Sequence, residues 1–236
     1  MSEKLPLALL PGLLCDARLW QPQVEALADL AAPWVADFTA QSSVGEMAES
    51  VLAAMPERFA LAGLSMGGYV CFEILRRAPE RVLRLALLDT KADPDSEEHT
   101  ARRRDLIALA EKGEFKGVTP RLLPLLIHEA RLKEEPLTTL VMDMAESVGK
   151  AAFLRQQKAI MGRPDNRPVL VRIACPTLVL CGRQDRLTPV AHHTAMAAGI
   201  RDARLVVLED CGHLATIERP EEVNAALRAW LSAESG

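Results

Sequence analysis

The stretch Gly63-Leu64-Ser65-Met66-Gly67-Gly68 lies between an apolar run at residues 59–62 and a helix-like stretch at residues 69–77. A Gly-x-Ser-x-Gly pattern between a strand and a helix forces the serine into a tight turn that exposes its hydroxyl at the top of a sheet. Glycine suits both flanks of this bend, because a Cβ there would collide with the adjoining strand and helix. A serine in such a turn can also be an ordinary helix N-cap. The rest of the chain has to separate the two interpretations.

The length of 236 residues fits one large α/β domain, or a core with a modest insertion. With 49% hydrophobic and 25% charged residues, the composition is that of a soluble globular protein. No stretch is long and apolar enough to span a bilayer. A formal net charge of -4 and an aromatic content of 4% give no reason to expect nucleic acid or an anionic membrane as a partner.

The cysteines argue for a reducing compartment. They are odd in number and include no Cys-x-x-Cys pair, which disfavours both a disulfide framework and a zinc knuckle: Cys15, Cys71, Cys175, Cys181 and Cys211. Pro6, Pro11 and Gly12 interrupt the apolar N-terminal stretch too early for a secretory signal. We therefore expect a cytoplasmic protein.

Short apolar runs alternate with helical patterns along most of the chain. This alternation predicts an α/β fold with a mainly parallel sheet and helices on both faces. We expect strands at residues 5–10, 34–38, 59–62, 83–88, 177–180 and 205–208. We expect helices at residues 19–30, 44–55, 69–77, 190–198 and 220–231.

The alternation stops between residues 93 and 167. This segment has no convincing strand and shows helical spacing instead, as at Leu137, Leu140, Val141 and Met144. We predict a core formed by residues 1–92 and 168–236 and a helical cap insertion over residues 93–167. Such a cap would exclude water from a site at the strand ends and shape its pocket.

Catalysis by Ser65 would need a base to take its proton and an acid to orient that base. The apolar run at residues 177–180 leads into a loop with Asp185, and the run at residues 205–208 leads into a loop with His213. The chain order Ser, Asp, His is the one expected for this strand-turn-helix arrangement. Asp89, which ends the run at residues 83–88, is an alternative acid or a simple turn residue. We favour Asp185.

With these motifs the chain resembles the α/β-hydrolase superfamily from its first strand to its last helix. The likeness rests on Leu9-Leu10-Pro11-Gly12-Leu13-Leu14, the Ser65 motif, Gly182-x-x-Asp185 with Pro189, and Gly212-His213 with Glu218-Arg219-Pro220. It is similar to small esterases, enol-lactonases and cofactor-free perhydrolases. Many relatives have His-Gly in place of Pro11-Gly12. The chain also begins at what would be the third strand of a full sheet, so we expect about six strands rather than eight.

The resemblance implies a role for each motif. Ser65 would be the nucleophile, His213 the general base and then acid, and Asp185 the orienting acid. Backbone N–H groups of Leu13 and Met66 would hold the developing oxyanion. The implied activity is that of a serine hydrolase, which cleaves a small carboxylic ester or lactone through an acyl-enzyme without a cofactor. A C–C bond hydrolase, a perhydrolase or a non-enzymatic ligand-binding protein stays open, because a fold does not specify a function.

Other polar residues are expected to be structural. His192 and His193 are adjacent in a predicted helix, point in different directions and make a poor metal pair, so we assign no metal. His99 and His128 are expected to be satisfied surface side chains. Cys211 is expected to be a small packing residue.

The run Arg102-Arg103-Arg104 has two interpretations. A charge run on a helix favours a solvated face. The alternative is that it recognises a carboxylate on the substrate.

Overall fold

The structure is a computed structural model that describes residues 4–233. These residues form one six-stranded sheet of order β2-β1-β3-β4-β5-β6, in which all neighbouring strands are parallel. The strands are β1 (Leu5–Leu10), β2 (Ala31–Val35), β3 (Phe59–Leu64), β4 (Val82–Leu88), β5 (Thr177–Gly182) and β6 (Ala203–Leu208). The predicted α/β fold with about six strands is confirmed.

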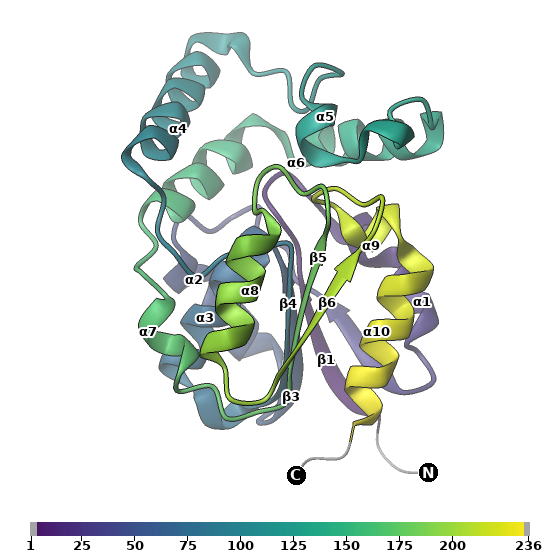
Figure 1. The fold of residues 1–236 in the computed structure, drawn as a ribbon. Coiled ribbons are helices and arrows are strands. Elements are labelled where there is room, and N and C mark those ends of the chain that lie inside the picture. The colour runs from purple at the N-terminus through teal and green to yellow at the C-terminus, as the bar shows by residue number, and fades with distance from the viewer. Residues whose placement is uncertain (1–3, 234–236) are drawn as a thin grey trace.

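Helices cover both faces of the sheet, which is why β3 and β5 are buried along their whole length (Figure 1). Alternate side chains of β1 enter different clusters: Ala8 and Leu10 pack on one face, Leu7 and Leu9 on the other. The first face carries α2 (Val44–Ala54), α3 (Met66–Arg77) and α8 (Val190–Gly199). The second carries α1 (Gln21–Ala26), α9 (Ala215–Glu218) and α10 (Pro220–Ser232).

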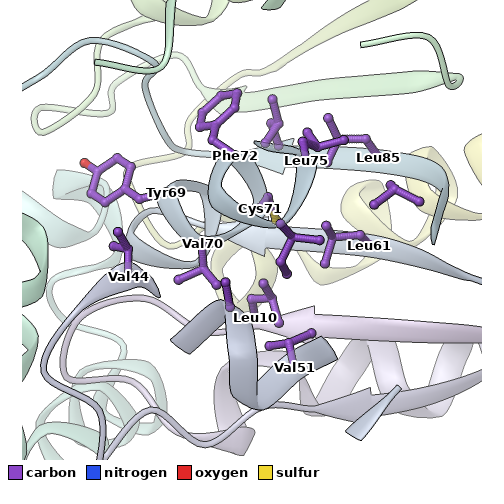
Figure 2. Packing of buried hydrophobic residues seen from close by; sticks show 14 of the residues in the cluster. Leu10, Val44, Val51, Leu61, Tyr69, Val70, Cys71, Phe72, Leu75 and Leu85 are labelled. Carbon is purple, nitrogen blue, oxygen red and sulfur yellow. The ribbon is translucent and has the colours of Figure 1, made fainter. Parts of the chain in front are cut away.

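The cluster between α2, α3 and the sheet holds the Ser65 turn in place. Figure 2 shows Val70 and Cys71 of α3 among side chains from α2 and the strands, including Val51, Leu10 and Leu61. All five are fully buried. Side chains packed this tightly oppose displacement of the helix that follows Ser65.

Two expected elements near the N-terminal end of the chain differ most in their bounds. The second strand was expected at residues 34–38, but β2 runs from Ala31 to Val35 and includes Pro33. Proline lacks the N–H of a central strand and is tolerated at a sheet edge, which is where β2 lies. The helix expected at residues 19–30 is a 3-10 turn, Ala17–Trp20, followed by the short α1.

The segment between β4 and β5 is helical throughout its regular structure, as predicted. It contains α4 (Glu97–Leu109), α5 (Leu123–Leu126), α6 (Glu135–Met161) and α7 (Arg167–Leu170). Figure 1 shows α4, α5 and α6 at the end of the sheet opposite the start of β1 and the end of α10. The long α6 has a break at Gly149, where φ is 75°. Among the helices within residues 4–233, none has the length and apolar character needed to cross a membrane.

The strand order creates a crevice at the carboxyl ends of β1 and β3. The chain leaves β1 outward to β2 and then returns across β1 to form β3, so the direction of winding reverses between β1 and β3. Open parallel sheets bind ligands at such a reversal, because the two loops leave it in opposite directions. Here those loops carry Leu13 and Ser65.

Candidate active site

Ser65 occupies the single-residue turn between β3 and α3, which starts at Met66, earlier than the helical pattern predicted. Its backbone has φ 54° and ψ -111°, a conformation that costs about 1–3 kcal/mol for a residue with a side chain. Its N–H donates to the Leu88 carbonyl at 3.0 Å, and the Thr90 hydroxyl donates to the Ser65 carbonyl at 2.8 Å. The Ser65 hydroxyl makes no capping bond to α3, which disfavours the N-cap interpretation.

The two glycines of the motif permit close packing around this turn. A Cβ on Gly67 would overlap the carbonyl oxygen of Leu10 in β1, and one on Gly63 would overlap the backbone of Gly67. A larger residue at either position would push α3 away from the sheet. The Gly-x-Ser-x-Gly pattern therefore has the steric basis that the sequence predicted.

The structure brings Ser65, His213 and Asp185 together from three separate loops. His213 Nε2 lies 2.9 Å from Ser65 Oγ, and His213 Nδ1 lies 2.8 Å from Asp185 Oδ2. Both distances are those of hydrogen bonds. His213 and Asp185 are buried, whereas Ser65 is half-buried and lines a cavity.

The Asp185 carboxylate is held by more than the histidine. It accepts the backbone N–H groups of Leu187 at 2.8 Å and Thr188 at 2.9 Å, and the Thr188 hydroxyl at 2.6 Å. Burial alone would raise the pKa of Asp185, but the positive charge of His213 and the hydrogen bonds from His213 and Thr188 lower that pKa below its ordinary value. An ionised carboxylate here fixes the imidazole tautomer with its Nδ1 proton toward Asp185.

Asp89, the alternative acid, has different partners. Its carboxylate accepts the N–H of Gly182 at 3.0 Å and that of Ala215 at 3.2 Å. These bonds tie the end of β4 to the end of β5 and to the start of α9. Burial, and then the negative charge of Asp185, raise the pKa of Asp89 well above its ordinary value. The geometry thus gives Asp89 the bonds of a structural turn residue.

The loop that carries His213 is anchored by Glu218, whose part the sequence reasoning missed. Glu218 Oε1 accepts the N–H groups of Gly212 at 3.0 Å and Leu214 at 3.2 Å, on either side of His213. Glu218 Oε2 accepts the N–H of His128 at 2.7 Å, and the His213 N–H donates to the Leu126 carbonyl. The loop is therefore bonded both to α9 and to the last residue of α5. Glu218 belongs to the Gly212-His213 and Glu218-Arg219-Pro220 motif, but the motif alone does not predict that its carboxylate binds the backbone on both sides of His213.

The loop after β1 passes close to Ser65, as the predicted oxyanion site requires. Within residues 4–233 the Leu13 N–H has no acceptor, and Met66 is the first residue of α3, where an N–H has no partner within the helix. Leu14, which follows Leu13, has φ 59° and donates its N–H to Gln156 Oε1 at 3.0 Å. Gln156 Nε2 donates to the Phe38 carbonyl at 3.1 Å. Sequence reasoning missed Gln156, because it lies 142 residues from Leu14.

Ser65 opens into a cavity of about 280 Å³. Its wall combines the candidate groups Ser65, His213 and Leu13 with side chains from α4, α6 and the β4–α4 loop. Helices from the segment between β4 and β5 therefore form part of the cavity wall. The exact domain boundaries stay a prediction.

The two adjacent histidines contact different groups. His192 Nδ1 lies 2.6 Å from Asp93 Oδ2, whereas His193 is fully buried and its Nε2 accepts the Thr90 N–H at 3.0 Å. Burial lowers the pKa of His193 to about 4. In the described part of the chain no three His, Cys, Asp or Glu side chains are arranged to hold a metal ion.

Two further expectations have different outcomes. Cys211 is fully buried, and burial raises the pKa of its thiol, as expected of a packing residue. The interpretation of the arginine run as a solvated face is wrong for Arg103, which is half-buried and bonds to Asp95 at 2.6 Å. Arg104 is exposed. A helical face cannot be assigned from a charge run alone, since that depends on what packs against it.

Comparison with known proteins identifies the family. A model of the alpha/beta hydrolase family matches residues 7–226, so the chain belongs to that family. A relative from Rhizobium rhizogenes, provisionally named carbamate hydrolase RutD, is 29% identical over 95% of this chain and 91% of its own.

Two solved structures share the fold closely. A thermophilic esterase from Thermogutta terrifontis has a TM-score of 0.87 and 30% identity, covering 97% of this chain and 90% of its own. An enol-lactonase from Burkholderia xenovorans has a TM-score of 0.89 and 25% identity, covering 98% of this chain and 93% of its own.

Proposed function

We propose that this protein is a serine hydrolase that cleaves the carboxylic ester or lactone of a small molecule through an acyl-enzyme. The observation that carries the proposal is the position of the His213 ring, with Nε2 2.9 Å from Ser65 Oγ and Nδ1 2.8 Å from Asp185. The similarity to an esterase and to an enol-lactonase supports this substrate class.

In the first half-reaction, Ser65 Oγ attacks the substrate carbonyl while His213 Nε2 takes the hydroxyl proton. The negative charge that develops on the carbonyl oxygen is stabilised by the N–H groups of Leu13 and Met66. Asp185 stabilises the imidazolium that forms. His213 then gives the proton to the alkoxide leaving group, the C–O bond breaks, and the acyl group stays on Ser65.

In the second half-reaction, His213 removes a proton from water as the water attacks the acyl carbonyl. Collapse of the second tetrahedral intermediate returns the proton to Ser65 Oγ and releases the carboxylic acid. For a lactone the leaving hydroxyl stays attached to the product, which is a hydroxy acid, or a keto acid where the lactone is an enol ester and the released enol tautomerises. Protein groups and water complete both steps.

The proposal is tested with p-nitrophenyl butyrate and an organophosphate probe that phosphorylates active serines. We expect ester turnover and labelling of Ser65. Ser65→Ala should abolish labelling and lower kcat at least about a thousandfold. Ser43→Ala, at the half-buried N-cap of α2 and outside the cavity wall, is a matched serine control that should keep both.

Folded protein that shows neither turnover nor Ser65 labelling would rule out the proposal. A panel containing an ester, a lactone and a carbamate then ranks the substrate classes. Tight ligand-induced thermal stabilisation without turnover on this panel would indicate a ligand-binding protein instead.

A further inference from the structure

The wall of the cavity around Ser65 carries more basic than acidic side chains. Its lysine, arginine and aspartate side chains are Lys91, Arg102, Arg103, Arg186 and Asp95. Arg186 lies 3.8 Å from Glu129, which leaves three basic groups against Asp95. The whole chain carries a formal net charge of -4. This concentration of positive charge is therefore a local property of the cavity and not a consequence of overall composition.

The single negative charge of Asp95 does not neutralise the three basic groups in contact with it. Its carboxylate lies 2.6 Å from Arg103 Nε, 2.8 Å from Arg163 Nη2 and 3.7 Å from Lys91 Nζ. Arg163 is 1% exposed and Asp95 is 5% exposed. Three cations thus contact one carboxylate in a poorly hydrated place, where an excess of charge is unfavourable without a further partner. The other acid that acts on Lys91, Asp93, is itself bonded to His192.

Two of these cations keep hydrogen-bond donors for another group. Arg103 donates Nε to Asp95 and Nη1 to Gln157 Oε1 at 2.9 Å, and its Nη2 has no acceptor within residues 4–233. Lys91 Nζ makes one long bond, to the Pro94 carbonyl at 3.3 Å, besides its 3.7 Å contact with Asp95. Arg103 and Lys91 both line the cavity that contains Ser65.

The basic group lies near the proposed reaction centre. Tyr69 lines the same cavity and follows Ser65 by about one turn of α3, or roughly 5 Å along its axis. The Arg163 guanidinium lies 4.1 Å from the centre of the Tyr69 ring. Tyr69 and Arg163 thus connect Ser65 with the cluster of cations around Asp95, and Ser65, Arg103 and Lys91 line the same cavity.

We propose that Lys91 and Arg103 bind a carboxylate of the substrate, so that the preferred ester or lactone carries an acid group on its acyl side. The inference rests on the proposed hydrolase function and specifies its substrate class: monoesters of small dicarboxylic acids, or lactones bearing a carboxylate. The free Arg103 Nη2 and Lys91 Nζ supply charge-assisted hydrogen bonds to the carboxylate oxygens.

The first test compares kcat/KM for p-nitrophenyl monoesters of succinic, glutaric and adipic acid with that for the neutral esters of butanoic, pentanoic and hexanoic acid. We expect at least one monoester to be preferred about tenfold or more over the neutral ester of similar length. Lys91→Met and Arg103→Met should each reduce this ratio, mainly by raising KM for the monoester. Arg104→Met, on the same helix but exposed and outside the cavity, should leave the ratio as it is.

A second test needs neither turnover nor a variant. Calorimetric titration of the wild-type protein with succinate, glutarate and adipate, and with the corresponding uncharged diamides, should show at least tenfold tighter binding of one dicarboxylate. This result decides the subsite even if Arg103→Met fails to fold, or if no ester is hydrolysed.

Equal kcat/KM for acidic and neutral esters, together with equal binding of diacid and diamide, would overturn the subsite. Ser65 labelling and turnover of neutral esters would persist in that case, so the proposed function would stand. Loss of labelling with retained dicarboxylate binding would reject the hydrolase and keep the anion site.

Discussion

Replacement of Gln156 tests whether a cap residue positions the proposed oxyanion site. Gln156 accepts the Leu14 N–H and donates to the Phe38 carbonyl, and it is 1% exposed. Gln156→Leu has a similar volume but leaves both backbone groups buried without a partner. At about 1–3 kcal/mol for each group, the loss of stability should be about 2–6 kcal/mol, partly offset by the apolar side chain.

The same substitution should slow catalysis. Leu14 follows Leu13 directly in the chain. Loss of the bond from the Leu14 N–H to Gln156 therefore lets the backbone move, and with it the Leu13 N–H that would hold the oxyanion. Removal of one such donor costs about a hundredfold to a thousandfold in kcat, and a displaced donor should cost part of that. We expect kcat on p-nitrophenyl butyrate to fall about tenfold or more with little change in KM, and Tm to fall by about 5–15 °C.

Gln156→Glu separates the two effects. Its carboxylate can still accept from Leu14 but cannot donate to Phe38, so it should keep more kcat than Gln156→Leu while still losing stability. Gln21→Leu makes the same chemical change on the surface and should alter Tm and kcat little. The reasoning is refuted if Gln156→Leu lowers Tm while kcat stays within about twofold of wild type.

Two other predictions follow from buried titratable groups. Asp185→Asn should lower kcat about a thousandfold or more through the wrong imidazole tautomer, whereas Asp89→Asn should act mainly on Tm; loss of turnover in Asp89→Asn with normal turnover in Asp185→Asn would show that the acid was assigned wrongly. Burial lowers the pKa of His193 from its ordinary value of 6.5 to about 4 in the folded protein, so the stability from burying it neutral is present above pH 6.5 and is lost as the pH falls toward 4, by about 3 kcal/mol in all. His193→Gln can still accept from Thr90 but does not titrate, and urea unfolding at pH 7 and pH 4.5 should show a smaller loss for it; equal losses would exclude His193 as the cause.

Most of the fold could be predicted from local patterns. Apolar runs between helical repeats predicted five of the six strands close to their bounds, because a strand covered on both faces must be apolar along its length. The remaining strand, β2, was predicted three residues too late in the chain. Pro33 is a poor strand residue except at a sheet edge, and only the assembled sheet shows which strands are edges.

The proximity of the candidate site residues could also be predicted from local patterns. Ser65, Asp185 and His213 each follow an apolar run, and the carboxyl ends of parallel strands meet at one edge of the sheet, so their proximity could be predicted without coordinates. The choice between Asp185 and Asp89 could not be made with the same force, because both follow strands. Only the structure shows that the Asp185 carboxylate contacts His213, whereas the Asp89 carboxylate contacts the Gly182 N–H.

The sequence by itself determined the class of fold, the tight turn at Ser65 and the order of the proposed catalytic groups, since these depend on backbone sterics and on short-range hydrophobic periodicity. Tertiary structure decided what surrounds them. Gln156 reaches Leu14, and Lys91, Arg103 and Arg163 converge on Asp95, across as many as 142 residues of chain. Such contacts depend on how the helices between β4 and β5 pack over the sheet, and no local pattern of charge or hydrophobicity specifies that packing.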